Sequence, residues 1–145
     1  MAEHRIRLTW TDGGKPFTYE TYPREHEIVF KDGQDRLTAS ASPAYRGDGT
    51  HGDPEDLLVA ALSSCHMLSF LAICTKKKIT VQSYEDDAVG FLENEGGKLW
   101  ITKVILRPKI VSSADAATLE QVHHLAHEAC FIANSVKTLI EVEPR

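Results

Sequence analysis

The sequence predicts a single α+β domain that covers residues 1–145. Three observations support this fold class: strand-like alternation in the N-terminal third, one long apolar segment that opens with helix-start residues, and a later stretch with helical spacing. The expected order is antiparallel strands, a buried central helix, two long strands, a second helix and a final strand. With 42% hydrophobic and 26% charged residues, the chain has the composition of an ordinary globular protein.

The N-terminal strands are predicted from alternating apolar and polar residues, the pattern of half-buried strands. Turn signals separate them at Asp12-Gly13-Gly14 and at Asp32-Gly33. Residues 42–53 are rich in Gly, Pro and Asp and predict a loop. The expected strands cover residues 6–10, 17–21, 26–30 and 36–41.

The central helix is predicted to start at Asp53-Pro54-Glu55-Asp56 and to run to about Thr75. An aspartate can cap, proline suits the first helical position, and acids complement the helix dipole. Residues 57–75 contain no Asp, Glu, Lys or Arg, and about 20 such residues can span a bilayer. Because this stretch holds several serines, a histidine and two cysteines in mid-chain, we expect no membrane span but a helix buried on all sides. A domain of this size can barely cover such a helix, so a partner subunit is expected.

The C-terminal half predicts two long strands, residues 79–92 and 99–111, joined by the Gly-rich turn 93–97. A second helix is expected over residues 113–137, where apolar residues recur with helical spacing. A closing strand is expected over residues 138–142.

Charge and cysteine content restrict the class of function. The net charge is −5, which argues against a broad nucleic-acid footprint. The one basic run, Lys76-Lys77-Lys78, follows an apolar stretch and predicts a solvated helix end. The first 15 residues have no apolar signal-peptide core, so a cytoplasmic protein is expected. In a reducing compartment three cysteines predict buried or chemically active thiols, because structural disulfides are rare there.

Taken one at a time, the candidate residues have ordinary explanations. Cys65, Cys74 and Cys130 each lie in an expected helix, and free cysteine is among the most buried residue types. Glu55 is an acid in the first turn of a helix, and Arg24 is a surface strand residue. No motif for phosphate, acyl-transfer or metalloprotease chemistry is present, and no cofactor is expected.

A metal site is one alternative. His123, His127 and Cys130 are spaced i, i+4 and i+7 on one helical face, and the Cys65-His66 pair could complete a ligand set. The paired Cys-x-x-Cys knuckles of a strong zinc signature are absent, so metal binding is the weaker interpretation.

Three motifs together carry a family resemblance. They are Pro54-Glu55-Asp56-Leu57-Leu58, Ser64-Cys65-His66 and Ala126-His127-Glu128-Ala129-Cys130, and Asn134-Ser135 follows before a short strand. In this order and separation they resemble the OsmC/Ohr family, the osmotically inducible protein C and organic hydroperoxide resistance proteins. The resemblance covers about residues 22–142 and implies the OsmC/Ohr-like fold as an intertwined homodimer.

The resemblance assigns a role to each cysteine motif. It implies that Cys65 is the peroxidatic cysteine and Cys130 the resolving one. Glu55, ten residues before Cys65, matches the active-site glutamate of the family. Ten residues of straight helix rise about 15 Å, so Glu55 is not expected to reach Cys65 of its own chain.

Arg24 stands where the family's thiolate-activating arginine is expected, and Glu55 would orient it. Arg36 and Arg46 are the other available arginines. His66 resembles a subgroup feature, because an aromatic residue often follows the cysteine. Either the long side chain of Arg24 spans the gap between Glu55 and Cys65, or Glu55 and Arg24 come from the partner subunit, and we favour the partner subunit.

The implied activity is a thiol-dependent peroxidase of the oxidative stress response that reduces small organic hydroperoxides. An apolar surround of Leu57, Met67, Leu68 and Phe70 suits an organic substrate. The disulfide would be reduced by an external dithiol, either a lipoylated protein or a small thiol. The alternatives are a non-catalytic ligand-binding or redox-sensing protein of the same fold, and the Cys/His metal site.

Overall fold

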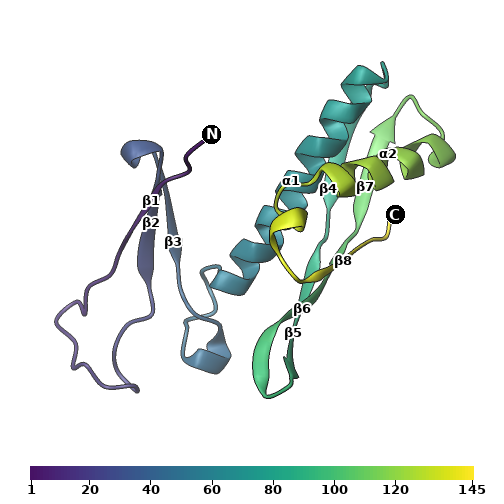
Figure 1. Cartoon of the computed structure of the whole chain (residues 1–145). Helices are drawn as coiled ribbons and strands as arrows, with labels where there is room; N and C mark the ends of the chain where they lie inside the picture. The colour runs from purple at the N-terminus through teal and green to yellow at the C-terminus, as the bar shows by residue number, and fades with distance from the viewer. The chain divides into compact units, whose positions relative to one another are not determined.

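The structure, a computed structural model, describes all residues 1–145 and has the predicted α+β fold class (Figure 1). The chain forms two compact units, Met1–Leu57 and Leu58–Arg145. Each unit is described by itself below. The prediction of one domain over residues 1–145 stays a prediction.

The first unit contains a three-stranded antiparallel sheet. Its strands are β1 (Ile6–Thr9), β2 (His26–Phe30) and β3 (Asp35–Ala39), in the order β1-β2-β3. The middle strand, β2, carries the buried side chains Ile28 and Val29. Short 3-10 turns follow β2 at Lys31–Gly33 and follow β3 at Pro43–Tyr45. The predicted second turn and the predicted loop are therefore confirmed.

The strand predicted over residues 17–21 is wrong. Tyr22 donates its backbone N–H to the Thr18 carbonyl at 3.0 Å, which closes a turn where a strand was expected. The aromatic residues of this segment pack on one another, with Phe17 and Tyr22 5.6 Å apart between ring centroids and Trp10 5.9 Å from Phe17. The alternating aromatic residues that predicted a strand pack on one another instead. No strand lies between β1 and β2, which pair directly.

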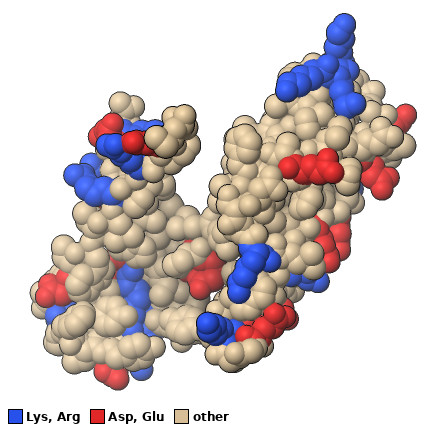
Figure 2. Space-filling view, viewed as in Figure 1, with Lys and Arg blue, Asp and Glu red and all other residues tan.

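Helix α1 (Pro54–Lys76) begins where the sequence predicts. Asp53 Oδ1 accepts the Asp56 N–H at 2.9 Å, and Asp56 Oδ2 accepts the Asp53 N–H at 3.2 Å. This reciprocal pair satisfies two backbone donors that the start of a helix leaves free. The basic run Lys76-Lys77-Lys78 is exposed at its other end, as predicted, where Figure 2 shows blue side chains gathered.

Within this chain α1 is not buried on all sides, and the expectation that a partner subunit completes its burial stays a prediction. Its fully buried residues form one stripe at i, i+4 spacing: Leu62, His66, Phe70 and Cys74. The stripe Ala60, Ser64, Leu68 and Ala72 is exposed, and Leu68 has 59% of its surface accessible. By length and composition α1 could cross a membrane, a test that core helices of soluble proteins also pass.

The second unit contains two small sheets. β5 (Val89–Glu95) pairs with β6 (Lys98–Leu106) in an antiparallel hairpin, and β8 (Leu139–Val142) adds to β6 in parallel. β4 (Val81–Asp86) pairs antiparallel with β7 (Pro108–Ser112).

Each of the two long strands predicted here is divided into two. The Asp86 carboxylate lies at the division and accepts the Arg107 backbone N–H at 2.7 Å. Pro108, the next residue, has no N–H to donate to a ladder. A side chain and a proline therefore replace the continuous backbone pairing that the alternation predicts.

Helix α2 (Ala116–Ala129) is shorter than the predicted 113–137. Asp115 caps its start by accepting the Thr118 N–H at 2.8 Å. The helix ends at Cys130, whose backbone is extended, and a 3-10 turn at Ala133–Ser135 follows. The predicted closing strand is confirmed as β8.

Two apolar clusters fill the second unit. One consists of Leu62, Ile101, Val104 and Leu106, and the other of Phe70, Cys74, Val122 and Ala126. α1 approaches β5 so closely that a Cβ at Gly90 would lie 2.6 Å from Val59 Cγ2. Glycine is required there by that contact.

Candidate active site

The structure brings Cys65 and Cys130 together between α1 and the end of α2. All three cysteines of the chain are free thiols. The Cys65 thiol lies close enough to that of Cys130 to raise its pKa. Cys65 is half-buried, whereas Cys130 is 1% exposed. The pair therefore consists of one thiol that solvent can reach and one that it cannot.

The end of α2 shapes the surroundings of Cys130. Its sulfur accepts the backbone N–H of Ala133 at 3.4 Å, which turns the chain out of the helix. Burial raises the pKa of the Cys130 thiol, and the neighbouring Cys65 raises it further. The backbone N–H groups of Ala133 and Ile132 act in the opposite direction. Cys130 is thus a protonated thiol, and the two backbone N–H groups can stabilise its thiolate when it forms.

Cys74 is a core residue. It is 1% exposed and packs with Phe70, Val122 and Ala126. Burial raises the pKa of its thiol, which disfavours reaction as a thiolate. The ordinary explanation proposed from the sequence holds for this cysteine.

In the first unit, Arg24 is 8% exposed, so the expectation that it is a surface residue is wrong. Its guanidinium donates to three backbone carbonyls, those of Tyr45 at 3.2 Å, Tyr22 at 2.5 Å and Tyr19 at 2.7 Å. It also stacks on the Tyr22 ring, 3.5 Å from the centroid. No carboxylate pairs with it, so its positive charge is buried without an acidic partner.

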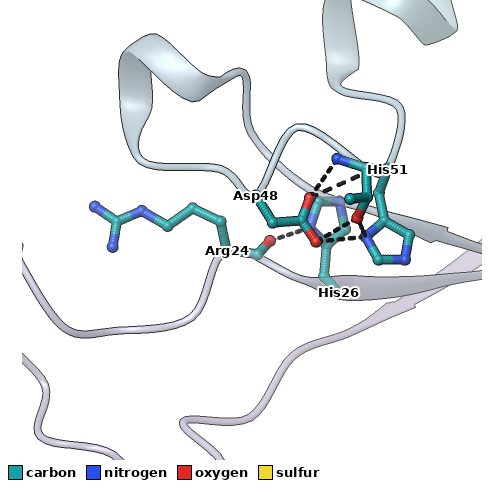
Figure 3. A network of polar contacts seen from close by, with 5 residues as sticks. Arg24, His26, Asp48 and His51 are labelled. Atoms are coloured by element: carbon teal, nitrogen blue, oxygen red, sulfur yellow. Dashed lines mark hydrogen bonds and ion pairs between the residues drawn. The ribbon is translucent and has the colours of Figure 1, made fainter.

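Figure 3 shows the Arg24 side chain pointing away from the nearby polar network of the same unit. In that network the Arg24 carbonyl contacts His26 Nδ1 at 2.9 Å. Asp48 accepts from the Thr50 backbone N–H at 2.9 Å and contacts His51 Nδ1 at 3.0 Å. Only the His26 contact involves the backbone of Arg24; the Asp48 contacts order the turn at residues 48–51.

The other candidate side chains have different surroundings. Arg36 forms an exposed ion pair with Glu27 at 2.8 Å. Arg46 lies 5.6 Å from the Tyr19 ring centroid. Glu55 is half-buried in the first turn of α1 and forms no ion pair. The expected orientation of Arg24 by Glu55 stays a prediction.

A second pair of residues joins α1 to α2, and the sequence did not predict their direct contact. His66 Nε2 and His123 Nδ1 lie 3.1 Å apart, and both rings are buried. Burial is the first cause that lowers the pKa of each histidine to about 4, and for His66 the neighbours His123 and His127 lower it further. Both imidazoles are therefore neutral at pH 7. The sequence analysis had placed both among the possible ligands of one metal site, and each lies on the buried stripe of its helix.

The metal alternative gains no support from this geometry. His123, which the sequence placed on one face with His127 and Cys130, is bonded to His66. No group of three or more His, Cys, Asp or Glu side chains is arranged to hold a metal ion.

The fold and the cysteine pair define an α+β protein with two neighbouring reduced thiols. The family model of OsmC-like proteins matches residues 47–145. The chain therefore belongs to the OsmC-like protein family. The matched region includes Glu55, Cys65 and Cys130, whereas Arg24 lies before it.

Relatives support the same family and fold. An OsmC-like protein of unknown function from Vibrio cholerae is 45% identical over all of both chains, with a TM-score of 0.92. An organic hydroperoxide resistance protein from Legionella pneumophila is 19% identical, covering 99% of this chain and 96% of its own, with a TM-score of 0.75. One from Elizabethkingia anophelis is also 19% identical, covers 99% and 95%, and has a TM-score of 0.73. The uncharacterised protein YmaD of Bacillus subtilis is 22% identical over 67% of each chain.

Proposed function

We propose that this protein is a thiol-dependent peroxidase that reduces organic hydroperoxides. The observation that carries the proposal is the accessible Cys65 thiol beside the buried Cys130 thiol, on opposite sides of an interhelical contact. Relatives of the same fold are named organic hydroperoxide resistance proteins, which supports this class of substrate.

In the first step the Cys65 thiolate attacks the outer oxygen of the hydroperoxide. The S–O bond forms as the O–O bond breaks, so the sulfur is oxidised to a sulfenic acid and the peroxide is reduced to an alcohol after one proton is taken up. Cys65 is suited to this step because it is the more accessible of the two thiols. Cys130 is buried and protonated, so it does not itself react with the peroxide.

In the second step Cys130 attacks the sulfenic sulfur of Cys65. The S–S bond forms, the S–O bond breaks, and the thiol proton leaves with the hydroxide as water. The N–H groups of Ala133 and Ile132 stabilise the Cys130 anion as the proton departs. An external dithiol then takes the oxidising equivalents and restores both thiols.

The role proposed for Arg24 is electrostatic. An ordinary thiol is a few per cent to a tenth ionised near neutral pH, so full ionisation gains roughly 10- to 30-fold in thiolate. The nucleophilicity of a thiolate falls as the pKa of its thiol falls, so lowering the pKa by three units costs roughly 20-fold in rate and nearly cancels that gain. The guanidinium must therefore act mainly on the developing alkoxide. Its lack of a carboxylate partner leaves the charge available for that purpose.

We further propose a homodimer in which Arg24 and Glu55 serve Cys65 of the partner subunit. Helix α1 is continuous over 23 residues, so Glu55 lies about 15 Å along the axis from Cys65 of its own chain. The exposed uncharged stripe of α1, together with Phe131 at 80% exposure beside Cys130, offers apolar surface for a second copy to cover.

The test of the activity is turnover of cumene hydroperoxide with dithiothreitol, compared for the wild-type protein and for Cys74→Ala. Both should consume peroxide over many cycles and yield cumyl alcohol. A wild-type protein that consumes no more peroxide than buffer with dithiothreitol contradicts the proposal.

The test of the dimer is complementation. Inactive Cys65→Ser protein is mixed with inactive Arg24→Ala protein under conditions that exchange subunits. A site shared between subunits regains activity in the mixed dimer, because one intact Cys65 then meets one intact Arg24. A mixture that stays inactive, or a monomer by light scattering, contradicts the shared site.

A further inference from the structure

The turn between α2 and β8 sets the position of the Cys130 thiol (Figure 1). The apolar spacing of the sequence favours a helix that continues to residue 137, but α2 ends at Ala129 and the backbone of Cys130 is extended. A 3-10 turn, Ala133–Ser135, follows. Contacts in this turn therefore oppose continuation of the helix.

Asn134 holds the chain on both sides of Cys130. Its backbone N–H donates to the Cys130 carbonyl at 3.0 Å. Its side-chain Nδ2 donates to the Glu128 carbonyl, also at 3.0 Å. Glu128 lies in the last turn of α2, where the carbonyls have no partner within the helix. The asparagine side chain therefore caps α2 and ties the turn to the helix by a bond that spans the cysteine.

The same bond competes with a longer helix. If α2 continued, the Glu128 carbonyl would accept the N–H of Ile132, four residues further on. The Ala133 N–H would also bond within the helix, whereas in the structure it donates to the Cys130 sulfur at 3.4 Å. Because the Asn134 amide occupies the Glu128 carbonyl, it favours the turn in which the Ala133 N–H reaches the sulfur.

We propose that Asn134 is a positioning residue for the resolving step, because its side-chain bond to the Glu128 carbonyl keeps the Cys130 sulfur beside Cys65. The inference rests on the proposed peroxidase function, in which Cys130 attacks the sulfenic sulfur of Cys65 and water leaves. Asn134 bonds to backbone carbonyls and to neither sulfur, so it acts on disulfide formation and not on the attack on the peroxide. Since the bond is neutral and exposed, its loss should change disulfide formation about three- to tenfold.

The first measurement needs no peroxide. Full-length protein is equilibrated with oxidised and reduced dithiothreitol, the free thiols are alkylated, and the Cys65–Cys130 disulfide is quantified by mass spectrometry. Asn134→Leu removes the amide at similar size, and Asn134→Asp keeps the shape but has no donor at pH 7. Each variant should lower the equilibrium constant for disulfide formation about three- to tenfold, because the thiols are held together less well. This change raises the reduction potential by about 14 to 30 mV.

The second measurement follows a single turnover with cumene hydroperoxide. Peroxide consumption reports formation of the sulfenic acid at Cys65, and dimedone added at intervals traps the fraction that has not yet become disulfide. In both Asn134 variants peroxide consumption should keep the wild-type rate, whereas conversion to the disulfide should slow about three- to tenfold. A general loss of stability would not separate the two steps in this way.

Thr138→Val is the matched control, because it also removes one side-chain bond to a backbone carbonyl, that of Ile101 at 2.8 Å, beyond the turn. It should keep the wild-type potential and the wild-type rate of disulfide formation. Asn134 variants that keep both values, or a control that changes them equally, would overturn the proposal, as would a wild-type protein that forms no Cys65–Cys130 disulfide with dithiothreitol. A wild-type protein that forms the disulfide but consumes no peroxide would contradict the peroxidase function instead, and the potentials would still decide the role of Asn134.

Discussion

Two side-chain pairs join α1 to the α2 region, and they differ in almost every chemical respect. Cys65 and His66 are neighbours on α1, but their partners Cys130 and His123 are seven residues apart. The cysteine pair lies where α2 ends, with one thiol reachable by solvent. The histidine pair lies within the packed core, where His123 also contacts Phe70 at 4.3 Å between ring centroids. The α1–α2 contact thus contains a reactive cysteine pair where the chain leaves α2 and a fixed histidine pair within the packed core.

The largest expected effect is on the cysteine pair and follows from substitution of Cys65. Cys65→Ser should lower peroxide turnover by at least about 10³-fold, because the nucleophile is removed. Cys74→Ala is the matched control, since Cys74 lies on the same helix but packs only in the core. It should keep turnover while losing some stability. Turnover is followed as loss of cumene hydroperoxide, and substantial activity in Cys65→Ser would remove Cys65 from the mechanism.

The second prediction separates the two thiols of the pair. Cys130→Ser should consume about one peroxide per subunit and then stop with a bulky protein dithiol, because the sulfenic acid at Cys65 has no internal partner. Dimedone should trap that acid, with the adduct located by mass spectrometry. Normal cycling of this variant would show that Cys130 does not resolve the intermediate.

The third prediction concerns Arg24. Arg24→Ala should lower the rate at saturating organic peroxide by about 10²- to 10³-fold, the usual loss when a donor to a developing oxyanion is removed. Because its three backbone carbonyls also lose a partner, urea unfolding must show that the variant remains folded under assay conditions. Arg36→Ala, which breaks an exposed ion pair, is the control. A rate fully restored by raising the pH would limit Arg24 to ionising the thiol.

The smallest expected effect belongs to the histidine pair and appears in stability alone. The pKa of His66 and of His123 is about 4 in the folded chain and about 6.5 when unfolded. The unfolded state therefore binds more protons between these values, so stability is complete above pH 6.5 and falls as the pH falls towards 4. The other groups that act on the pKa values of the pair are His127, which lowers that of His66, and Asp86, which raises that of His123.

Between pH 7 and pH 5 each histidine should contribute a loss of about 2 kcal/mol in the free energy of unfolding. The measurement is urea unfolding at both pH values, a range in which most carboxylates stay ionised. His123→Phe should reduce this slope and His124→Gln should keep it. A slope unchanged by His123→Phe would mean that other groups cause it.

The sequence was sufficient where one local signal decides the structure. The acids and proline at residues 53–56 predicted the start of α1, and the Gly-rich turn 93–97 predicted the β5–β6 hairpin. Alternation failed over residues 17–21, because aromatic residues spaced for a strand can also pack on one another in a turn. It also failed at Asp86, whose side chain takes the backbone bond that would continue the strand.

The candidate site shows the same division. The resemblance to the OsmC/Ohr family implied that Cys65 and Cys130 meet, and the structure brings the two thiols together. The end of α2 at Cys130 was not predictable, because no Gly or Pro marks it and a sulfur accepting the Ala133 N–H closes it instead. The direct His66–His123 contact was not predictable for a further reason: it joins residues 57 positions apart, and the sequence grouped them only as possible ligands of one metal ion.

The parallel pairing of β8 with β6 has a consequence for synthesis of the chain. Residues 103–106 of β6 pair with residues 139–142, which are synthesised only after the whole of α2. Until then, the β6 edge that carries Val104 and Leu106, both almost fully buried in the finished fold, has no strand beside it. An unpaired apolar edge is a template for association with other chains. The nascent protein is therefore prone to aggregate until β8 has been synthesised, and loss of residues 139–142 would make that condition permanent.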